Sequence, residues 1–276
     1  MPLIQIIEEN KVGRDFIVGD IHGCFTKLEC ELYNIGFNKE KDRLFSVGDL
    51  IDRGPESEKA IEYLSYPWFF AVRGNHEQMA IDGYHSHRGD PAALHLINGG
   101  GWFYNLHEND QRNTVVVFGD LPIAMTVKTK RGSFGITHAE PCSNDWLEAL
   151  ELISSVDKYS IKKSIWGRDK LKSKDKTNIK NVDHVYCGHT PIDNVITLGN
   201  TTFLDTGAVY KGGRLTILQV TGMLDIWNSL DGMASNSLAK KSYLEYDKYK
   251  SELFEEGLEW ADAELILTGF IYGFEG

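Results

Sequence analysis

The chain has 276 residues, of which 42% are hydrophobic and 25% charged, and its formal net charge is −11 at pH 7. This is the composition of a globular protein with a sizeable core. The acidic charge argues against a nucleic-acid-binding surface, which relies on clustered Lys and Arg side chains. No run of 18 apolar residues exists, and Glu8 and Glu9 lie where a signal peptide would be basic or apolar. We therefore expect a cytoplasmic protein with neither a nucleic-acid nor a membrane partner.

The first third of the chain alternates apolar runs with amphipathic segments. Residues 16–18, 44–47 and 69–72 are rich in β-branched and aromatic side chains, which is typical of buried strands. Residues 25–37 and 57–64 lie between them and carry apolar side chains at helical spacing. This order predicts parallel strands joined by crossover helices.

The middle of the chain has a different pattern. Residues 88–91 and 98–101 are rich in Gly and polar residues and bracket an apolar patch, so we expect surface turns there. Seven short apolar runs predict a second set of strands, antiparallel or mixed. They span residues 115–118, 123–127, 134–136, 185–187, 195–198, 202–204 and 215–220. The predicted fold class is α/β (α+β), with two mixed sheets packed face to face as a central β-sandwich flanked by helices.

Two later segments differ in charge. Residues 158–180 hold nine Lys or Arg, a pattern that favours a solvated loop over a surface that steers substrate. Residues 221–276 hold 11 acidic residues against four Lys, with aromatic residues at helical spacing. We therefore divide the chain into a main domain, residues 1–220, and an acidic, helical C-terminal extension, residues 221–276.

Five of the predicted strands end in polar motifs that contain metal-competent side chains. Open α/β sheets bind ligands at the carboxyl ends of their strands, so we expect the five motifs to meet at one edge of the fold. The motifs are Gly19-Asp20-Ile21-His22-Gly23, Gly48-Asp49-Leu50-Ile51-Asp52-Arg53-Gly54, Arg73-Gly74-Asn75-His76-Glu77, Thr137-His138-Ala139 and Gly188-His189-Thr190-Pro191.

The side chains in these motifs match the needs of two divalent ions. Asp20 and His22 lie two residues apart and so share one face of an extended segment, and Asp49 can bridge two ions through its two oxygens. Two ions about 4 Å apart lower the pKa of a shared water and stabilise displacement at phosphorus. Each motif alone would fit a turn or a core histidine, but five together favour a metal site. The predicted ligands are Asp20, His22, Asp49, Asn75, His138 and His189.

The remaining polar residues of the motifs suit the chemistry of a phosphate ester. The side chain of His76 should point away from that of the preceding Asn75, which leaves its imidazole to protonate a leaving alkoxide. Asp52 is placed to hydrogen-bond that imidazole. Arg53 and Arg73 have planar guanidinium groups that fit phosphate oxygens, with surface ion pairing as the alternative.

In this order the motifs resemble the phosphoprotein phosphatase branch of the metallophosphoesterases, in its bacteriophage-like form. The likeness runs from about residue 15 to residue 220 and includes residues 98–103 and 205–209. It implies that residues 1–220 are a metallophosphoesterase catalytic domain. One ion would bind to Asp20, His22 and Asp49, and the other to Asp49, Asn75, His138 and His189.

The resemblance also implies the remaining roles. The ions would be manganese, with iron or zinc as alternatives. His76 would be the general acid, supported by Asp52. Arg53, Arg73 and the arginine of Trp166-Gly167-Arg168 would bind the phosphoryl group.

The function that we predict is metal-dependent hydrolysis of phosphoserine and phosphothreonine, with phosphotyrosine as an additional substrate, in phosphoproteins or phosphopeptides. A dimetal-activated water would attack phosphorus directly. Hydrolysis of dinucleoside polyphosphates is an alternative, because a related bacterial branch has a similar first motif but lacks an Asp at position 52. A catalytically weak binding module is a second alternative, against which the intact ligand set argues. The oligomeric state stays open.

Overall fold

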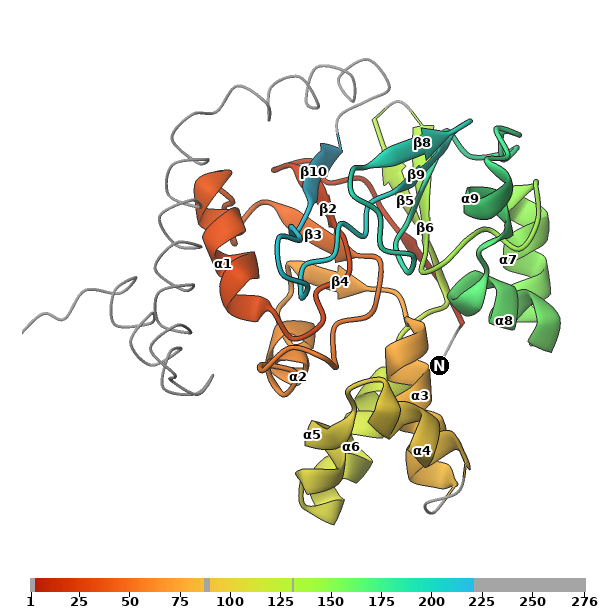
Figure 1. Cartoon of the computed structure of the whole chain (residues 1–276). Helices are drawn as coiled ribbons and strands as arrows, with labels where there is room; N and C mark the ends of the chain where they lie inside the picture. The colour runs from red at the N-terminus through yellow and green to blue at the C-terminus, as the bar shows by residue number, and fades with distance from the viewer. Residues whose placement is uncertain (1–2, 87–89, 131, 221–276) are drawn as a thin grey trace, which may run out of the picture. The chain divides into compact units, whose positions relative to one another are not determined.

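Two β-sheets form the centre of the fold (Figure 1). The computed structural model describes residues 3–86, 90–130 and 132–220. The predicted C-terminal extension, residues 221–276, therefore lies outside the described residues. The predicted fold class, a central β-sandwich of two sheets flanked by helices, is confirmed.

The smaller sheet contains the predicted parallel strands. Its order is β10-β2-β3-β4, in which β2, β3 and β4 are parallel and β10 runs antiparallel to β2. Helices α1 and α2 connect the parallel strands, as the alternating pattern predicts. The elements are β2 (Asp15–Val18), α1 (Phe25–Asn34), β3 (Arg43–Ser46), α2 (Lys59–Leu64), β4 (Phe69–Ala71) and β10 (Ile217–Val220).

The larger sheet is mixed and has the order β1-β5-β6-β7-β9-β8. Strands β6, β7 and β9 are parallel neighbours, whereas β5 pairs antiparallel with β6. The first strand, β1 (Ile4–Ile7), was not predicted, and it pairs in parallel with β5. The others are β5 (Ala124–Thr129), β6 (Gly132–Thr137), β7 (His184–Cys187), β8 (Ile196–Leu198) and β9 (Thr201–Phe203).

Alternation along the strands divides the core into layers. Phe16 and Val18 of β2 pack with α1 and α2, while Ile17 between them faces the larger sheet. There it joins a cluster that includes Met125 and Tyr186. A third cluster lies on the far side of the larger sheet, against α7 (Trp146–Ser154) and α8 (Lys158–Trp166). Because successive strand residues point to opposite faces, each sheet can be covered on both sides.

Four helices follow β4 where the sequence indicated turns and a strand. They are α3 (Asn75–His85), α4 (Asp90–Ile97), α5 (Gly101–Asn105) and α6 (Glu108–Gly119), and they lie together in Figure 1. The predicted strand at 115–118 is wrong, because these residues form the last turns of α6. Val115 and Phe118 are buried while Val116 is 58% exposed, which is a helical and not an alternating pattern. Four consecutive apolar residues do not distinguish the two structures.

The basic segment 158–180, for which we expect a solvated loop, contains two helices. It forms α8 and a short helix, α9 (Asp169–Ser173). Asp157 caps α8 by accepting a hydrogen bond from the Ser160 N–H at 2.8 Å, and Ile165 anchors the helix in the core. None of the helices in the described ranges is long and apolar enough to cross a membrane.

Candidate metal centre and active site

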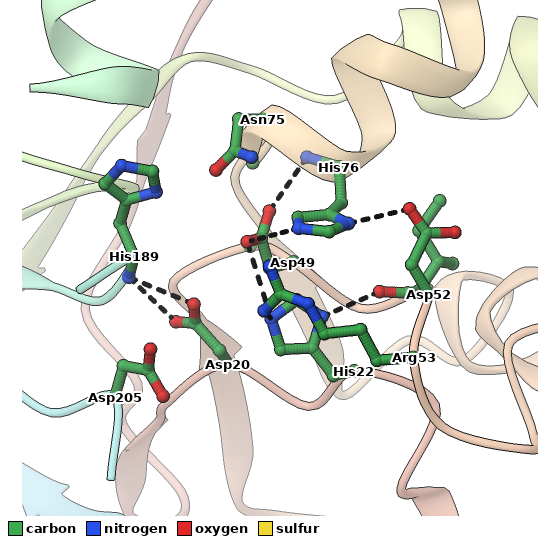
Figure 2. A network of polar contacts seen from close by, with 12 residues as sticks. Asp20, His22, Asp49, Asp52, Arg53, Asn75, His76, His189 and Asp205 are labelled. Carbon is green, nitrogen blue, oxygen red and sulfur yellow. Dashed lines mark hydrogen bonds and ion pairs between the residues drawn. The ribbon is translucent and has the colours of Figure 1, made fainter. Parts of the chain in front are cut away.

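The five polar motifs meet where the strands of both sheets end. Figure 2 shows residues of four of them facing one another. Asp20 and His22 follow β2, and Asp49 follows β3. Asn75 and His76 open α3 directly after β4. The other two predicted ligands come from the larger sheet. His138 follows β6 and His189 follows β7. All six predicted ligands and His76 are buried.

The backbone of the site is strained in a consistent way. His22, Asp49 and His189 have positive φ angles of 46°, 51° and 71°. Asp52 and Arg53 have φ angles of 72° and 69°. The left-handed region is unfavourable for residues with a Cβ, and such residues cluster at functional sites.

The carboxylate of Glu77 holds the Asp49 turn in this conformation. Its oxygens accept hydrogen bonds from the N–H groups of Gly74, Asp49 and Leu50 at 2.8, 3.0 and 2.8 Å. Burial, followed by the charge of Asp49, raises the pKa of Glu77 to about 7. Gly74 has no room for a side chain, since a Cβ there would lie 2.1 Å from Asp49 Oδ1. The turn therefore presents the Asp49 carboxylate in one orientation.

Asp49 belongs to two groups of side chains whose metal-ligating atoms lie close together. On one side, His22 Nε2 and His76 Nε2 lie 3.7 and 3.8 Å from Asp49 Oδ2. On the other side, His138 Nε2 lies 3.3 Å from Asp49 Oδ1, and His189 completes the second group. A carboxylate with a separate set of donors at each oxygen has the arrangement expected of a bridging ligand.

The imidazoles are oriented by backbone carbonyls. His22 Nδ1 donates to the carbonyl of Ile51 at 2.9 Å, and His138 Nδ1 donates to the carbonyl of Val47 at 2.8 Å. Burial is the largest cause that lowers the pKa of His22 to about 3, and it also lowers the pKa of His189 to about 3. In His22 a neutral imidazole with Nδ1–H engaged leaves Nε2 for a metal ion. Asn75 Oδ1 lies 2.9 Å from His138 Nε2, so it faces the same point.

Asp205 was missed as a candidate residue. It follows β9, and its Oδ2 is buried without a hydrogen-bond partner among the described residues. Burial, and then the charge of Asp205, raises the pKa of Asp20, whose oxygens accept the His189 N–H at 3.0 and 3.2 Å. Asp205 comes directly after an apolar run that ends in Leu204 and lies two residues before a glycine, and a carboxylate at a strand end is the signal that could have found it.

The donor set therefore fits divalent cations. Three carboxylates, those of Asp20, Asp49 and Asp205, are buried close enough to perturb one another. Buried carboxylates with unsatisfied oxygens are costly unless a cation neutralises them. Oxygen and imidazole donors suit manganese, iron and zinc alike.

His76, whose Nε2 belongs to the first of the two groups at Asp49, also forms a buried pair with Asp52. His76 Nδ1 lies 2.7 Å from Asp52 Oδ2, and both side chains are almost fully buried. His76 Nε2 is buried and has no hydrogen-bond partner within the described part of the chain. The side chains of Asn75 and His76 thus diverge, one toward His138 and the other toward Asp52.

The three candidate arginines have different environments. Arg53 Nη1 donates to His22 Nε2 at 2.6 Å, and Arg168 Nε donates to His189 Nε2 at 3.1 Å. The guanidinium of Arg73 instead donates to the carbonyls of Gly119 and Leu121 at 2.6 and 3.1 Å and to Gln78 at 3.0 Å. The structure brings Arg53 and Arg168 to the site histidines and places Arg73 against the end of α6.

A β-sandwich whose strand ends gather carboxylates, an amide and imidazoles at one edge is the arrangement of a metallophosphoesterase. The model of the calcineurin-like phosphoesterase family matches residues 16–193. The chain belongs to this family and is a phosphoesterase.

Curated relatives extend the match to most of the chain. Serine/threonine-protein phosphatase 1 of Salmonella typhimurium is 36% identical over 223 residues, which cover 79% of this chain and 97% of the relative. Serine/threonine-protein phosphatase 2 of Escherichia coli is 31% identical over 222 residues, with 78% and 97% covered. A symmetrical bis(5'-nucleosyl)-tetraphosphatase of Pseudomonas syringae is 44% identical, but over only 64 residues, 22% of each protein.

Solved structures share the fold at lower identity. A serine/threonine phosphatase from Saccharomyces cerevisiae has a TM-score of 0.52 and 16% identity, with 80% of this chain and 84% of that chain covered. A putative diadenosine tetraphosphatase has a TM-score of 0.51 and 19% identity, with 79% and 99% covered. At this identity the likeness establishes the fold alone.

Proposed function

We propose that this metallophosphoesterase hydrolyses phosphoserine and phosphothreonine in proteins, with phosphotyrosine as an additional substrate. The observation that carries the proposal is the buried His76–Asp52 pair, whose imidazole lies next to Asp49, the residue shared by the two groups of metal-ligating atoms. It provides a proton donor for an alkoxide that leaves poorly. The Salmonella and Escherichia relatives, which match this chain over 97% of their own length, are both named serine/threonine-protein phosphatases. Their names support the same substrate class for this chain.

Six residues are assigned to the metal ions. Asp49 would bridge, with Asp20 and His22 on one ion and Asn75, His138 and His189 on the other. Asp205 would add negative charge beside Asp20. When bound, the ions would lower the pKa of a water molecule and stabilise charge at phosphorus. Manganese is our choice, with iron and zinc as the alternatives.

The other residues act on the phosphoryl and leaving groups. Arg53 and Arg168, which lie at His22 and His189, would donate hydrogen bonds to phosphoryl oxygens. His76 would give the proton on Nε2 to the leaving oxygen, while Nδ1–H stays bonded to Asp52. We assign His76 to proton transfer and not to a metal, although its Nε2 lies near Asp49. Asp20, on the strand-end turn with His22, already supplies the second carboxylate.

The test is phosphate release by the full-length chain with added manganese. We expect release from phosphoserine and phosphothreonine peptides, slower release from phosphotyrosine, and little cleavage of a dinucleoside tetraphosphate by chromatography. Asp49→Asn should remove the activity because it breaks both donor groups. Asp110→Asn, which changes an exposed carboxylate of α6, is the matched control and should retain it.

His76→Asn separates proton donation from metal binding in the same assay. We expect turnover to fall about 10²- to 10⁴-fold, the usual contribution of a general acid, with unchanged metal content. Loss of metal in this variant would make His76 a ligand. Cleavage of only the dinucleotide would establish the alternative hydrolase, and metal binding without hydrolysis of any substrate would favour a binding module.

A further inference from the structure

The Asp52 carboxylate contacts two further side chains besides that of His76. Its Oδ1 accepts a hydrogen bond from Trp102 Nε1 at 2.7 Å. His95 Nε2 lies 3.1 Å from Oδ1 and 3.0 Å from Oδ2, so it contacts both oxygens. Asp52 and His95 are both fully buried. Three side chains therefore converge on one carboxylate, and two of them lie outside the five motifs.

The protons in this network follow from the chemistry of its members. An ionised carboxylate accepts hydrogen bonds only, so His95 must carry its proton on Nε2. Its Nδ1 lies 3.3 Å from the Tyr104 hydroxyl, which fixes the other edge of the ring. Burial raises the pKa of Asp52, but the hydrogen bonds from His76 and His95 outweigh it and hold the pKa below its usual range. The Nε2–H group of His95 thus serves as a fixed donor to the Asp52 carboxylate.

The glycine run between α4 and α5 allows this contact. A Cβ on Gly100 would lie 2.2 Å from Cδ2 and 2.3 Å from Nε2 of His95. Gly99 has a φ of +100°, and a Cβ there would lie 2.6 Å from the backbone N of Arg53. The predicted turn at residues 98–101 is therefore present, but it packs closely on the Asp52–Arg53 segment.

We propose that His95 is a positioning residue for the general acid, acting through Asp52 together with Trp102. The proposal rests on the proposed role of His76. By holding both oxygens of Asp52, the two donors keep Oδ2 facing His76 Nδ1. If the carboxylate lost them, it could rotate, and His76 would no longer be held with Nε2 toward the leaving group. Buried polar networks of this kind act as a unit.

Substitutions at position 95 can separate donation from packing. His95→Leu removes the N–H donor, and His95→Gln keeps one near the position of Nε2. His184→Leu is the control, since His184 is a partly buried imidazole that bonds Thr202 and lies outside the network. Each purified full-length variant is assayed with manganese on phenyl phosphate, a poor leaving group, and on 4-nitrophenyl phosphate, a good one. Metal content and thermal melting are measured in parallel.

We expect His95→Leu to lower kcat for phenyl phosphate about 10-fold more than kcat for 4-nitrophenyl phosphate, with little change in KM or metal content. His95→Gln should recover most of the loss. Trp102→Phe, which removes the second donor, should give the same selectivity even if His95→Leu does not fold. In the Asp52→Asn background, His95→Leu should cause no further selective loss, because the two residues act in series.

Two outcomes overturn the proposal and are distinguishable from failure of the proposed function. If His76→Asn is selective for the poor leaving group and neither His95→Leu nor Trp102→Phe is, the positioning role is wrong while the general acid stands. Equal loss on both substrates in the position 95 and 102 variants also rejects it, because that is the mark of a structural role. If His76→Asn itself is not selective, the assignment of the acid fails and the positioning role fails with it.

Discussion

Single side chains in this protein take their roles from partners that lie far away in the chain. Arg53, Arg73 and Arg168 all belong to polar motifs, and their residue type suggests one shared role in binding phosphate. The structure gives Arg53 and Arg168 histidine partners at the site, whereas Arg73 holds two carbonyls at the end of α6. A guanidinium can donate hydrogen bonds to phosphate oxygens and also to backbone carbonyls, so the residue type alone does not decide between them.

This difference leads to a prediction at the residue scale. Arg168→Ala should lower kcat/KM about 10- to 100-fold without changing the melting temperature, because a charge-assisted contact to phosphate is lost. Arg73→Ala should lower the free energy of unfolding by about 2 to 3 kcal/mol, because buried carbonyls lose a charged donor. Activity assays and denaturant titrations measure the two effects. Arg112→Ala, an exposed arginine of α6, is the control and should change neither quantity. A large loss of kcat/KM with unchanged stability in Arg73→Ala would place Arg73 in the phosphate site instead.

Helices and strands were predicted well where their apolar pattern is local. The runs at 16–18, 44–47 and 69–72 overlap β2, β3 and β4, and the polar residues that follow them are the ones that meet at the site. Besides the unpredicted β1 and the helices within 158–180, the errors lie between residues 75 and 119, where glycines and short apolar runs indicated turns and a strand. There α3 packs against α4 and α6, and the segment after α4 packs on the Asp52–Arg53 loop. Such contacts between distant segments override local propensity.

The turn between α1 and β3 allows a prediction at the scale of an element. The buried Asp42 carboxylate accepts the Arg14 N–H at 2.8 Å, the Asn38 N–H at 2.9 Å and the Arg14 side chain at 2.6 Å. Burial raises the pKa of Asp42, but these hydrogen bonds outweigh it and hold the pKa below its usual range. A depressed pKa stabilises the fold above the unfolded pKa of about 3.9 and loses that effect as pH falls through the folded value.

Asp42→Asn should therefore lower the free energy of unfolding by about 1 to 3 kcal/mol at pH 7. The melting temperatures of wild type and variant should converge as the pH falls from 5 toward 3. Thermal melts across this range measure the difference, and Asp110→Asn serves as the exposed control. A difference that stays constant down to pH 3 would show that charge on Asp42 does not supply the stability.

At the scale of the whole molecule, the site joins the two sheets. Asp20, Asp49 and Asn75 come from the ends of the smaller sheet, while His138 and His189 come from the ends of the larger one. The proposed ions would link segments that are far apart in the chain. Asp20 and His189, for example, are 169 residues apart and are joined by a hydrogen bond from the His189 N–H to the Asp20 carboxylate. Such a site exists only in the folded state, so binding contributes to stability.

Metal removal should accordingly lower the melting temperature. At a manganese concentration about 100 times the dissociation constant, the ion stabilises the fold by roughly 2.7 kcal/mol, or about 5 to 10 °C for a domain of this size. Thermal melts of chelator-treated protein with and without manganese measure the shift. Asp49→Asn should lose it and Asp110→Asn should keep it. An identical melting temperature with and without manganese in the wild type would argue against a metal site that spans the sheets.

The sequence by itself determined the strand ends and the residues that follow them, because alternation and glycine punctuation act over a few neighbouring residues. Tertiary structure alone decided that 115–118 belongs to a helix, that Arg73 faces the end of α6, and that Asp205 lies beside Asp20. It also decided that His95 reaches Asp52 from 43 residues further along the chain. These outcomes depend on which distant surfaces pack together, and no local pattern of residue types carries that information.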